Sequence, residues 1–237
     1  SFELGTVEHG GTNNWNQFAF IVDGDNQFLY INGLLLDSEL EQYNFNDVYA
    51  LSQIGSEGKS NANNDSYFNG MLDELSVWDL PLTSQQIQAH MNTPPSGDEL
   101  GLIAYWNFNS GSGNILYDHS GNQNHGTIIG ATWIEDVPPT SGGENSLSFD
   151  GVDDYVDFGY PLFEEINSTG SFSVSVDIEN PENPVGGRLV SYISQNPDNS
   201  FSLSLNSSQN GEAVSFGLCQ ISGTANNDCY SISGLLE

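Results

Sequence analysis

The chain has 237 residues, of which 37 % are apolar and 11 % aromatic, a composition that can build a packed core and argues against disorder. It carries 32 acidic residues against only Lys59 and Arg188, so its formal net charge is −30. Such a chain repels phosphate backbones and anionic lipid headgroups, which excludes nucleic acid and acidic membranes as partners. The carboxylates favour a solubility role, with a need for divalent cations as the second interpretation.

Short alternations of apolar and polar residues recur about every 8–12 residues between turn signals, which is typical of an all-β sandwich or barrel. The first two strands are predicted at residues 18–24 and 27–33, joined by a turn at 23–26 (DGDN), and Asn32 with Gly33 predicts the next tight turn. Further strands are predicted at residues 67–79, 101–108, 126–134, 145–151, 154–159, 171–178, 188–194, 200–206 and 212–220.

One short helix is predicted near residues 83–91. Thr83 or Ser84 caps the run SQQIQAHM, and the helix ends before Pro94 and Pro95. Residues 93–99 (TPPSGDE) have the composition of a linker. The chain is therefore predicted to be essentially all-β.

Several longer motifs resemble laminin-G-like, concanavalin A-like jelly-roll domains. Residues 102–138, with the loop DHSGNQNHGT, and residues 145–156 (NSLSFDGVDDYV) are similar to the opening half of that family. Residues 13–36 resemble its middle hairpin, and residues 69–90 (NGMLDELSVWDLPLTSQQIQAH) resemble its closing strand and small helix. The resemblance covers most of the chain and implies an antiparallel β-sandwich of the jelly-roll type.

The order of these motifs is the reverse of the family order. Residues 1–92 resemble the C-terminal half of a jelly roll, residues 93–99 form the linker, and residues 100–237 resemble the N-terminal half. Half a sandwich exposes its inner face and its strand edges, so each half needs a complement. The complement comes from an adjacent repeat in a tandem array, from the next subunit of a head-to-tail filament, or from the same chain as a circular permutant. We favour the array or the filament.

The loop at residues 118–126 (DHSGNQNHG) offers carboxylate, amide and backbone carbonyl oxygens in a tight turn, which are the ligands that a hard cation prefers. The resemblance implies that this loop faces the closing strand, so that Glu74 or Asp73 completes the cage; strand parity leaves the choice open, with Glu74 preferred. In the alternative interpretation the Asp and Asn residues only brace the turn. The predicted ligands of a structural Ca²⁺ are Asp118, Asn122, Asn124, Glu74 and Asp73.

Two other groups of residues favour structural roles. The acidic run at residues 150–154 (DGVDD) reads as a hairpin turn, because Asp and Gly are typical turn residues. The four tryptophans offer faces on which a sugar could stack, but each lies in a strand-like pattern that favours core packing, with at least one of them partly exposed. They are Trp15, Trp78, Trp106 and Trp133.

The remaining features indicate a secreted protein. Cys219 and Cys229 are spaced to face each other across one hairpin, so a disulfide is predicted, with two free thiols as the alternative. Glycosylation sequons begin at Asn64, Asn167 and Asn206. No apolar stretch approaches transmembrane length, and the chain is interpreted as a mature piece of an extracellular or cell-surface protein.

The sequence lacks a catalytic set. Laminarinase-type hydrolases of this fold use the pattern E-x-D-x-x-E on one strand, and that pattern does not occur here. The sequence therefore favours a non-catalytic structural or adhesive module whose partners are other copies of itself or adjacent repeats. The alternative is a Ca²⁺-dependent, lectin-like module that binds glycans.

Overall fold

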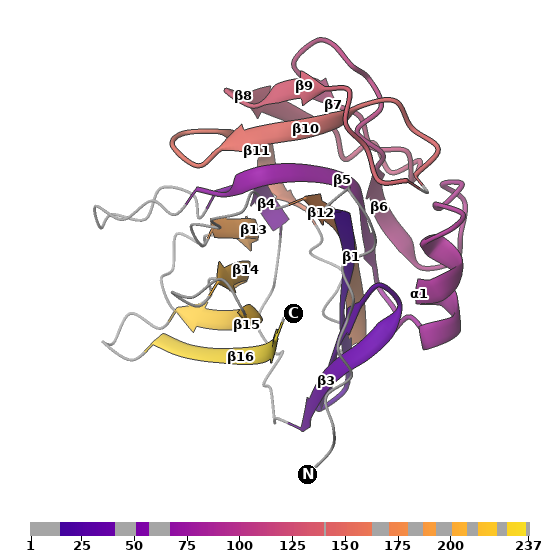
Figure 1. The fold of residues 1–237 in the computed structure, drawn as a ribbon, viewed down its shortest axis with the longest axis vertical. Helices are drawn as coiled ribbons and strands as arrows, with labels where there is room; N and C mark the ends of the chain where they lie inside the picture. Colours follow the sequence, from indigo (N-terminus) through magenta and orange to yellow (C-terminus); the bar gives the residue numbers. More distant parts are fainter. Residues whose placement is uncertain are drawn as a thin grey trace.

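The computed structural model describes residues 15–40, 51–56, 67–139, 141–162, 171–179, 187–192, 201–207, 213–221 and 227–235. Side-chain environments are described for residues 15–38, 53–56, 67–139, 141–159 and 171–179. The described elements are strands in two antiparallel sheets and one short helix, which confirms the predicted all-β sandwich (Figure 1).

The first sheet, called sheet A below, has β5 at its centre. Strand β5 pairs with β12 along one edge, and along the other edge with β10 and then β6. In spatial order its strands are β3 (Leu34–Leu40), β2 (Asn26–Ile31), β1 (Trp15–Asp23), β12 (Ser171–Glu179), β5 (Asn69–Trp78), β10 (Ser146–Asp150) and β9 (Thr132–Ile134), with β6 (Leu102–Trp106) also on β5.

The second sheet, sheet B, lies opposite sheet A in Figure 1 and contains most of the strands near the C-terminus. Its strands in spatial order are β16 (Asn227–Leu235), β15 (Ala213–Ile221), β14 (Phe201–Ser207), β13 (Gly187–Tyr192), β4 (Leu51–Ile54), β11 (Tyr155–Leu162), β8 (Gly126–Ile129) and β7 (Ile115–Leu116).

Strands from both predicted segments share these two sheets within one chain. From residues 1–92, β1 pairs with β12, β4 lies between β11 and β13, and β5 lies between β12 and the pair β10 and β6. All of these partners come from residues 100–237. Strands of the two segments therefore pair with each other in the single chain.

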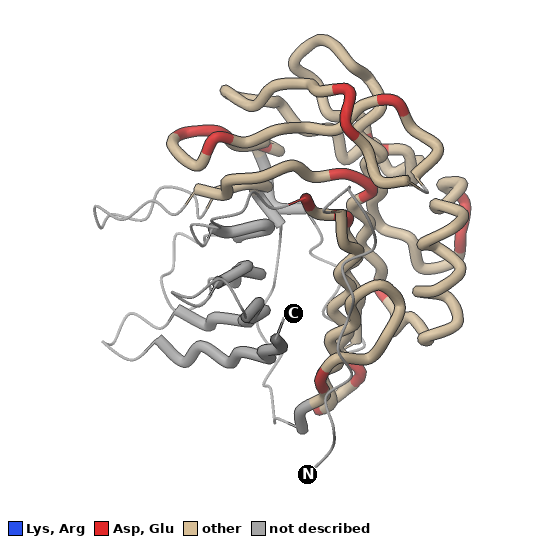
Figure 2. Tube along the Cα trace, in the orientation of Figure 1, with Lys and Arg blue, Asp and Glu red and all other residues tan. Residues whose placement is uncertain are grey.

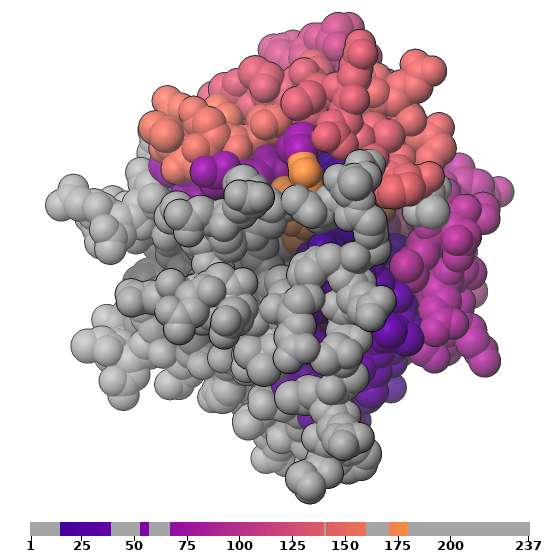
Figure 3. Space-filling view, in the orientation of Figure 1, coloured from indigo at the N-terminus to yellow at the C-terminus, as the bar shows by residue number. Residues whose placement is uncertain are grey.

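Alternation along the strands fills two cores. Phe18, Phe20 and Val22 of β1 belong to a large core with residues of both sheets, while Ala19 and Ile21 belong to a second cluster with Ile87 of α1. Since alternate residues of a strand point to opposite faces, α1 (Ser84–His90) covers the outer face of sheet A. Figure 3 shows α1 and the segment after it (magenta) at the surface beside the indigo strands.

Helix α1 begins where the sequence predicts. The Thr83 hydroxyl accepts from the N–H of Gln86, while the Gln86 side chain accepts from the N–H of Thr83, which is a capping box. The helix docks on the turn between β2 and β3. There Asn32 and Gly33 both have positive φ, and a Cβ on Gly33 would come within 2.8 Å of Gln88, so glycine is required for this contact.

Two predicted elements differ in the structure. The strand predicted at residues 126–134 is broken at Gly130, which has φ of 80°, so that β8 joins sheet B and β9 joins sheet A. The prediction of a turn at 150–154 is confirmed, but the prediction that it closes a hairpin is wrong, because β10 belongs to sheet A and β11 to sheet B. It is a crossing between sheets, and the local sequence of such a turn resembles that of a hairpin.

We expect Trp106→Ala to lower the free energy of unfolding by about 3–5 kcal/mol, measured by urea denaturation. Trp106 is fully buried, its Nε1 donates to the Asn124 carbonyl at 2.9 Å, and its ring lies 5.0 Å from that of Phe158 in the other sheet. Leu100→Ala is the control, because Leu100 is 91 % exposed and its loss should change stability by less than about 0.5 kcal/mol. Equal losses in the two variants would contradict this packing.

Candidate functional site

A β-bulge in β5 places two acidic residues side by side on the outer face of sheet A. Leu72 and Leu75 both belong to the core between the sheets, although an unbroken strand would place them on opposite faces. The register with β12 shifts here, and Glu74 has a positive φ of 51°. The bulge lies where the neighbour of β5 changes, because β5 pairs with β10 up to Leu72 and with β6 from Leu75 onward. Asp73 and Glu74 therefore both point to the outer face of sheet A, so strand parity does not have to choose between them.

Neighbouring strands extend this pair into a row of polar side chains. Asp177 of β12 lies directly opposite Asp73 on one side and opposite Gln17 of β1 on the other. At the other end, the Tyr105 hydroxyl of β6 donates to Glu74 Oε2. We call these five residues, Gln17, Asp177, Asp73, Glu74 and Tyr105, the acidic row.

The acidic row is buried, and several of its oxygens lack hydrogen-bond partners. Asp73 has no exposed surface, and Gln17, Asp177 and Tyr105 are each at least nine-tenths buried. Asp73 Oδ1 accepts from the N–H of Glu74 at 2.9 Å. Three buried oxygens, Asp73 Oδ2, Glu74 Oε1 and Gln17 Oε1, have no hydrogen-bond partner among the described residues. Each such acceptor is costly unless a donor, a proton or a cation reaches it.

Burial dominates the electrostatics of the row. It raises the pKa of Asp73 to about 9, with added repulsion from Glu74 and Asp177. It also raises the pKa of Glu74 to about 8, although the Tyr105 hydroxyl works against the shift, and raises the pKa of Asp177 to about 7. Burial and the facing carboxylates raise the pKa of Tyr105 as well. Among the residues whose side chains are described, Figure 2 shows no Lys or Arg.

The predicted loop lies beside the row and is braced internally. Asp118 Oδ1 accepts from the N–H of Tyr105 and of Ser120, and its Oδ2 accepts from the Ser120 hydroxyl and the N–H of Asn124. The Asn122 and Asn124 amides both donate to the Ile103 carbonyl. These bonds bring the three predicted ligands together, and Tyr105 links them to Glu74.

A structural Ca²⁺ fits one part of the predicted ligand set better than the other. Four donors already occupy the Asp118 carboxylate, while the amide groups of Asn122 and Asn124 hold the backbone. Asp73 and Glu74, in contrast, each have a buried oxygen without a partner. The cage that includes Asp118 stays a prediction, and the available ligand atoms lie on β5.

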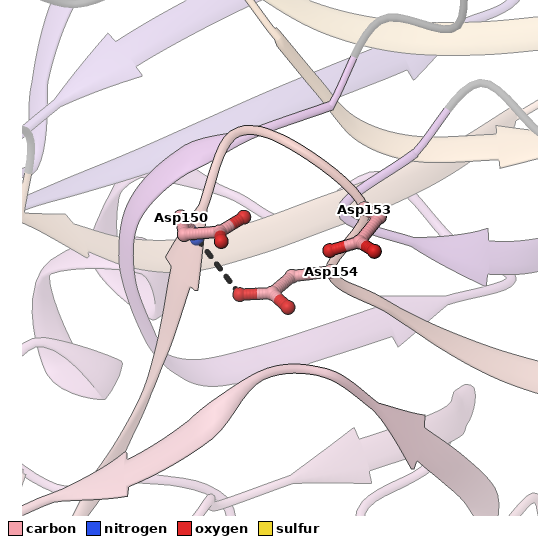
Figure 4. Close-up of side chains that lie close together, drawn as sticks. All are labelled: Asp150, Asp153 and Asp154. Carbon is pink, nitrogen blue, oxygen red and sulfur yellow. Dashed lines mark hydrogen bonds between the residues drawn. The ribbon is translucent and has the colours of Figure 1, made fainter.

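A second acidic group lies at the crossing between the sheets. One carboxylate oxygen from each of Asp150, Asp153 and Asp154 lies within 4.8 Å of the others (Figure 4). Asp154 Oδ2 accepts from the N–H of Asp150, and Asp150 Oδ1 accepts from the N–H of Val152, both at 2.8 Å. Asp150 and Asp153 are exposed. The bonds are those of a braced turn, as the sequence suggested.

The other predicted site residues have the following positions. Cys219 lies directly opposite Cys229 in the pairing of β15 with β16, the arrangement that the predicted disulfide needs, and the disulfide itself stays a prediction. Asn206 lies in β14, while Asn64 and Asn167 are outside the described residues. Among the tryptophans Trp15, Trp78 and Trp106 are buried, whereas Trp133 is partly buried.

The sequence did not reveal Gln17, Asp177 or Tyr105 as members of a site. Asp177 stands in the alternating strand SFSVSVDI at an outward position, where a polar residue normally faces water. The Asp177 carboxylate is unusual only because this face of sheet A is covered, so that the charge is buried. The single local signal is that Asp177 is charged where the preceding outward residues, Ser173 and Ser175, are neutral.

The described residues thus form an antiparallel β-sandwich with a buried acidic row on one sheet. Residues 5–88 match the family described as "Concanavalin A-like lectin/glucanases superfamily". This segment is therefore similar to concanavalin A-like, laminin-G-like domains, and its strands share both sheets with strands of residues 100–237. No curated protein and no solved structure gave a match.

In chelator-treated protein we expect the melting temperature to fall as pH rises from about 5 to about 9. The carboxyls of the acidic row have raised pKa values, so the native state binds more protons than the unfolded chain above pH of about 4. Their contribution to stability is therefore complete below pH of about 4 and is lost as the pH rises through about 7 to 9. Asp73→Asn should flatten this dependence, whereas Asp153→Asn, in the exposed turn, should not. Parallel pH curves for wild type and Asp73→Asn would contradict the assignment.

We expect Asp118→Ala to lower the free energy of unfolding by about 2–4 kcal/mol, because several donors to a buried carboxylate lose their acceptor. Denaturant unfolding with and without calcium measures the effect. An equal loss in both conditions identifies bracing, and a loss found only with calcium identifies Asp118 as a ligand. Asp98→Ala is the control at an exposed aspartate.

Proposed function

We propose that this chain is a non-catalytic structural or adhesive module of an extracellular polymer. In this polymer, segments 1–92 and 100–237 of neighbouring copies or repeats complete each other's sandwich. The observation that carries the proposal is the pairing of β5 on both edges with strands of the later segment. Laminin-G-like domains are typically extracellular, and among the described residues no helix has the length and apolar character to cross a membrane.

Exchange between copies would preserve every contact between the segments. The ladders of β1 with β12 and of β5 with β12, β10 and β6 form equally well when the two segments belong to different chains. Only the connection between α1 and β6 has to change its path. In the closed chain this connection is held by Glu99, which accepts from the N–H groups of Ser96 and Gly97. These few bonds lie at or near the surface and give little resistance to opening.

Burial of the acidic row supports the non-catalytic part of the proposal. A retaining glycosidase needs two carboxyl groups about 5 Å apart that both reach the sugar. Asp73 has no exposed surface, and Asp177 is 8 % exposed, so a polysaccharide chain does not reach this pair. Of the exposed aspartates at the crossing, Asp150 accepts a hydrogen bond that braces the turn, and Asp153 lies beside it.

A lectin-like module is the second candidate, favoured by an exposed aromatic side chain beside the loop at 118–126. Tyr117 is 45 % exposed, and its ring centroid lies 5.3 Å from that of His125 in a T-shaped contact. Exposed aromatic faces suit sugar rings, although three of the four tryptophans are buried in the sandwich. Tight, calcium-dependent binding of the monomer on a glycan array would favour this candidate over the structural module.

A cross-linking experiment tests the exchange of segments. Ser76 and Ser175 lie directly opposite each other on β5 and β12, one in each segment. Copies carrying only Ser76→Cys are mixed with copies carrying only Ser175→Cys, refolded together and oxidised. We expect a disulfide-linked dimer, because exchange brings the two cysteines together between chains.

The double variant in one chain is the positive control for the geometry. Mass spectrometry of the mixed sample, together with light scattering of the wild-type chain, measures the outcome. A cross-link within the double variant combined with its absence from the mixture, and a monomer at every concentration, would show that the chain closes on itself and would overturn the polymer.

A further inference from the structure

The buried face of sheet A contains acceptors without donors. Asp73 Oδ2, Glu74 Oε1 and Gln17 Oε1 have no hydrogen-bond partner among the described residues, and Asp73 and Gln17 are more than nine-tenths buried. They come from β5 and β1, on either side of Asp177 in β12. Burying several such oxygens together is unfavourable unless positive charge or protons satisfy them.

The chemistry of these atoms selects a class of ligand. All of them are oxygens, from two carboxylates and an amide, and Asp177 adds a third carboxylate on the same face. Oxygen ligands with several negative charges suit Ca²⁺, whereas zinc favours nitrogen and sulfur. Among the described side chains no Lys or Arg competes for them (Figure 2).

We propose that Asp177 and Gln17 form, with Asp73 and Glu74, a site for one Ca²⁺ ion at the bulge of β5. The site is independent of the proposed polymer and excludes Asp118. The carboxylate oxygens of the acidic row do not all lie within 4.8 Å of one another, as those of Asp150, Asp153 and Asp154 do. Binding of the ion therefore requires the row carboxylates to move closer together. Glu74, the most exposed of the four, supplies most of this movement.

The position of the site gives it a role in assembly. Gln17, Asp73 and Glu74 come from segment 1–92, while Asp177 comes from segment 100–237. The ligand set is complete only where β12 lies between β1 and β5, whether the segments belong to one chain or to two. Calcium therefore holds the two segments together and offsets the repulsion between their carboxylates.

Thermal unfolding of the full chain tests the site, with calcium removed by chelation and then restored. At calcium about 100-fold above its Kd, the wild-type melting temperature should rise by about 5–10 °C. Asp177→Asn should melt higher than wild type without calcium, because repulsion is relieved, and should lose the rise with calcium. Gln17→Glu should melt lower without calcium and show a larger rise. The matched control, Asp153→Asn in the turn, should keep the wild-type rise.

A Tb³⁺ titration gives a second readout that does not depend on stability. Emission sensitised by Tyr105, whose hydroxyl bonds to Glu74, should saturate in the wild type and in Asp153→Asn. In Asp177→Asn the apparent affinity should fall by about 10-fold or more. Two results would overturn the proposal. If calcium does not raise the melting temperature of the wild type, protons alone satisfy the acidic row. If the rise in melting temperature is lost in Asp153→Asn and kept in Asp177→Asn, the ion binds at the turn.

Discussion

Strand β5 holds the described structure together because its two edges are completed by strands that come after it in the chain. Strand β12 follows one edge, and β10 and β6 divide the other between them. Hydrogen bonds across these edges connect residues far apart in sequence, so neither segment forms sheet A without the other. The large core between the sheets and the smaller core under α1 both rest on this pairing.

The bulge follows from the same division. Where the neighbour of β5 changes from β10 to β6, no single strand on that edge keeps β5 in register, and two residues of β5 lie opposite one residue of β12. Asp73 and Glu74 then face outward together, next to Asp177. The change of neighbour along one edge of β5 thus produces the bulge that gathers these buried carboxylates on one face of sheet A.

Local sequence signals predicted what local interactions decide. The turn at Asn32 and Gly33 and the cap at Thr83 depend on a few adjacent residues, and the structure agrees with both. The break at Gly130 and the crossing at 150–154 depend on which sheet a strand joins, which adjacent residues do not encode. Strand parity left the choice between Asp73 and Glu74 open because parity assumes an unbroken strand, and the bulge places both on one face. Asp177 was not identified from the sequence because its burial depends on residues elsewhere in the chain.

The charge distribution has a consequence for the response to salt. With Lys59 and Arg188 as the only Lys and Arg residues, the chain has almost no salt bridges to lose when ions screen its charges. Screening instead weakens repulsion among the 32 acidic residues, at distances set by a Debye length of about 8 Å at physiological ionic strength. We therefore expect added salt to stabilise this fold and low ionic strength to destabilise it. A brine, and not dilute buffer, is the solvent for which such a surface is suited.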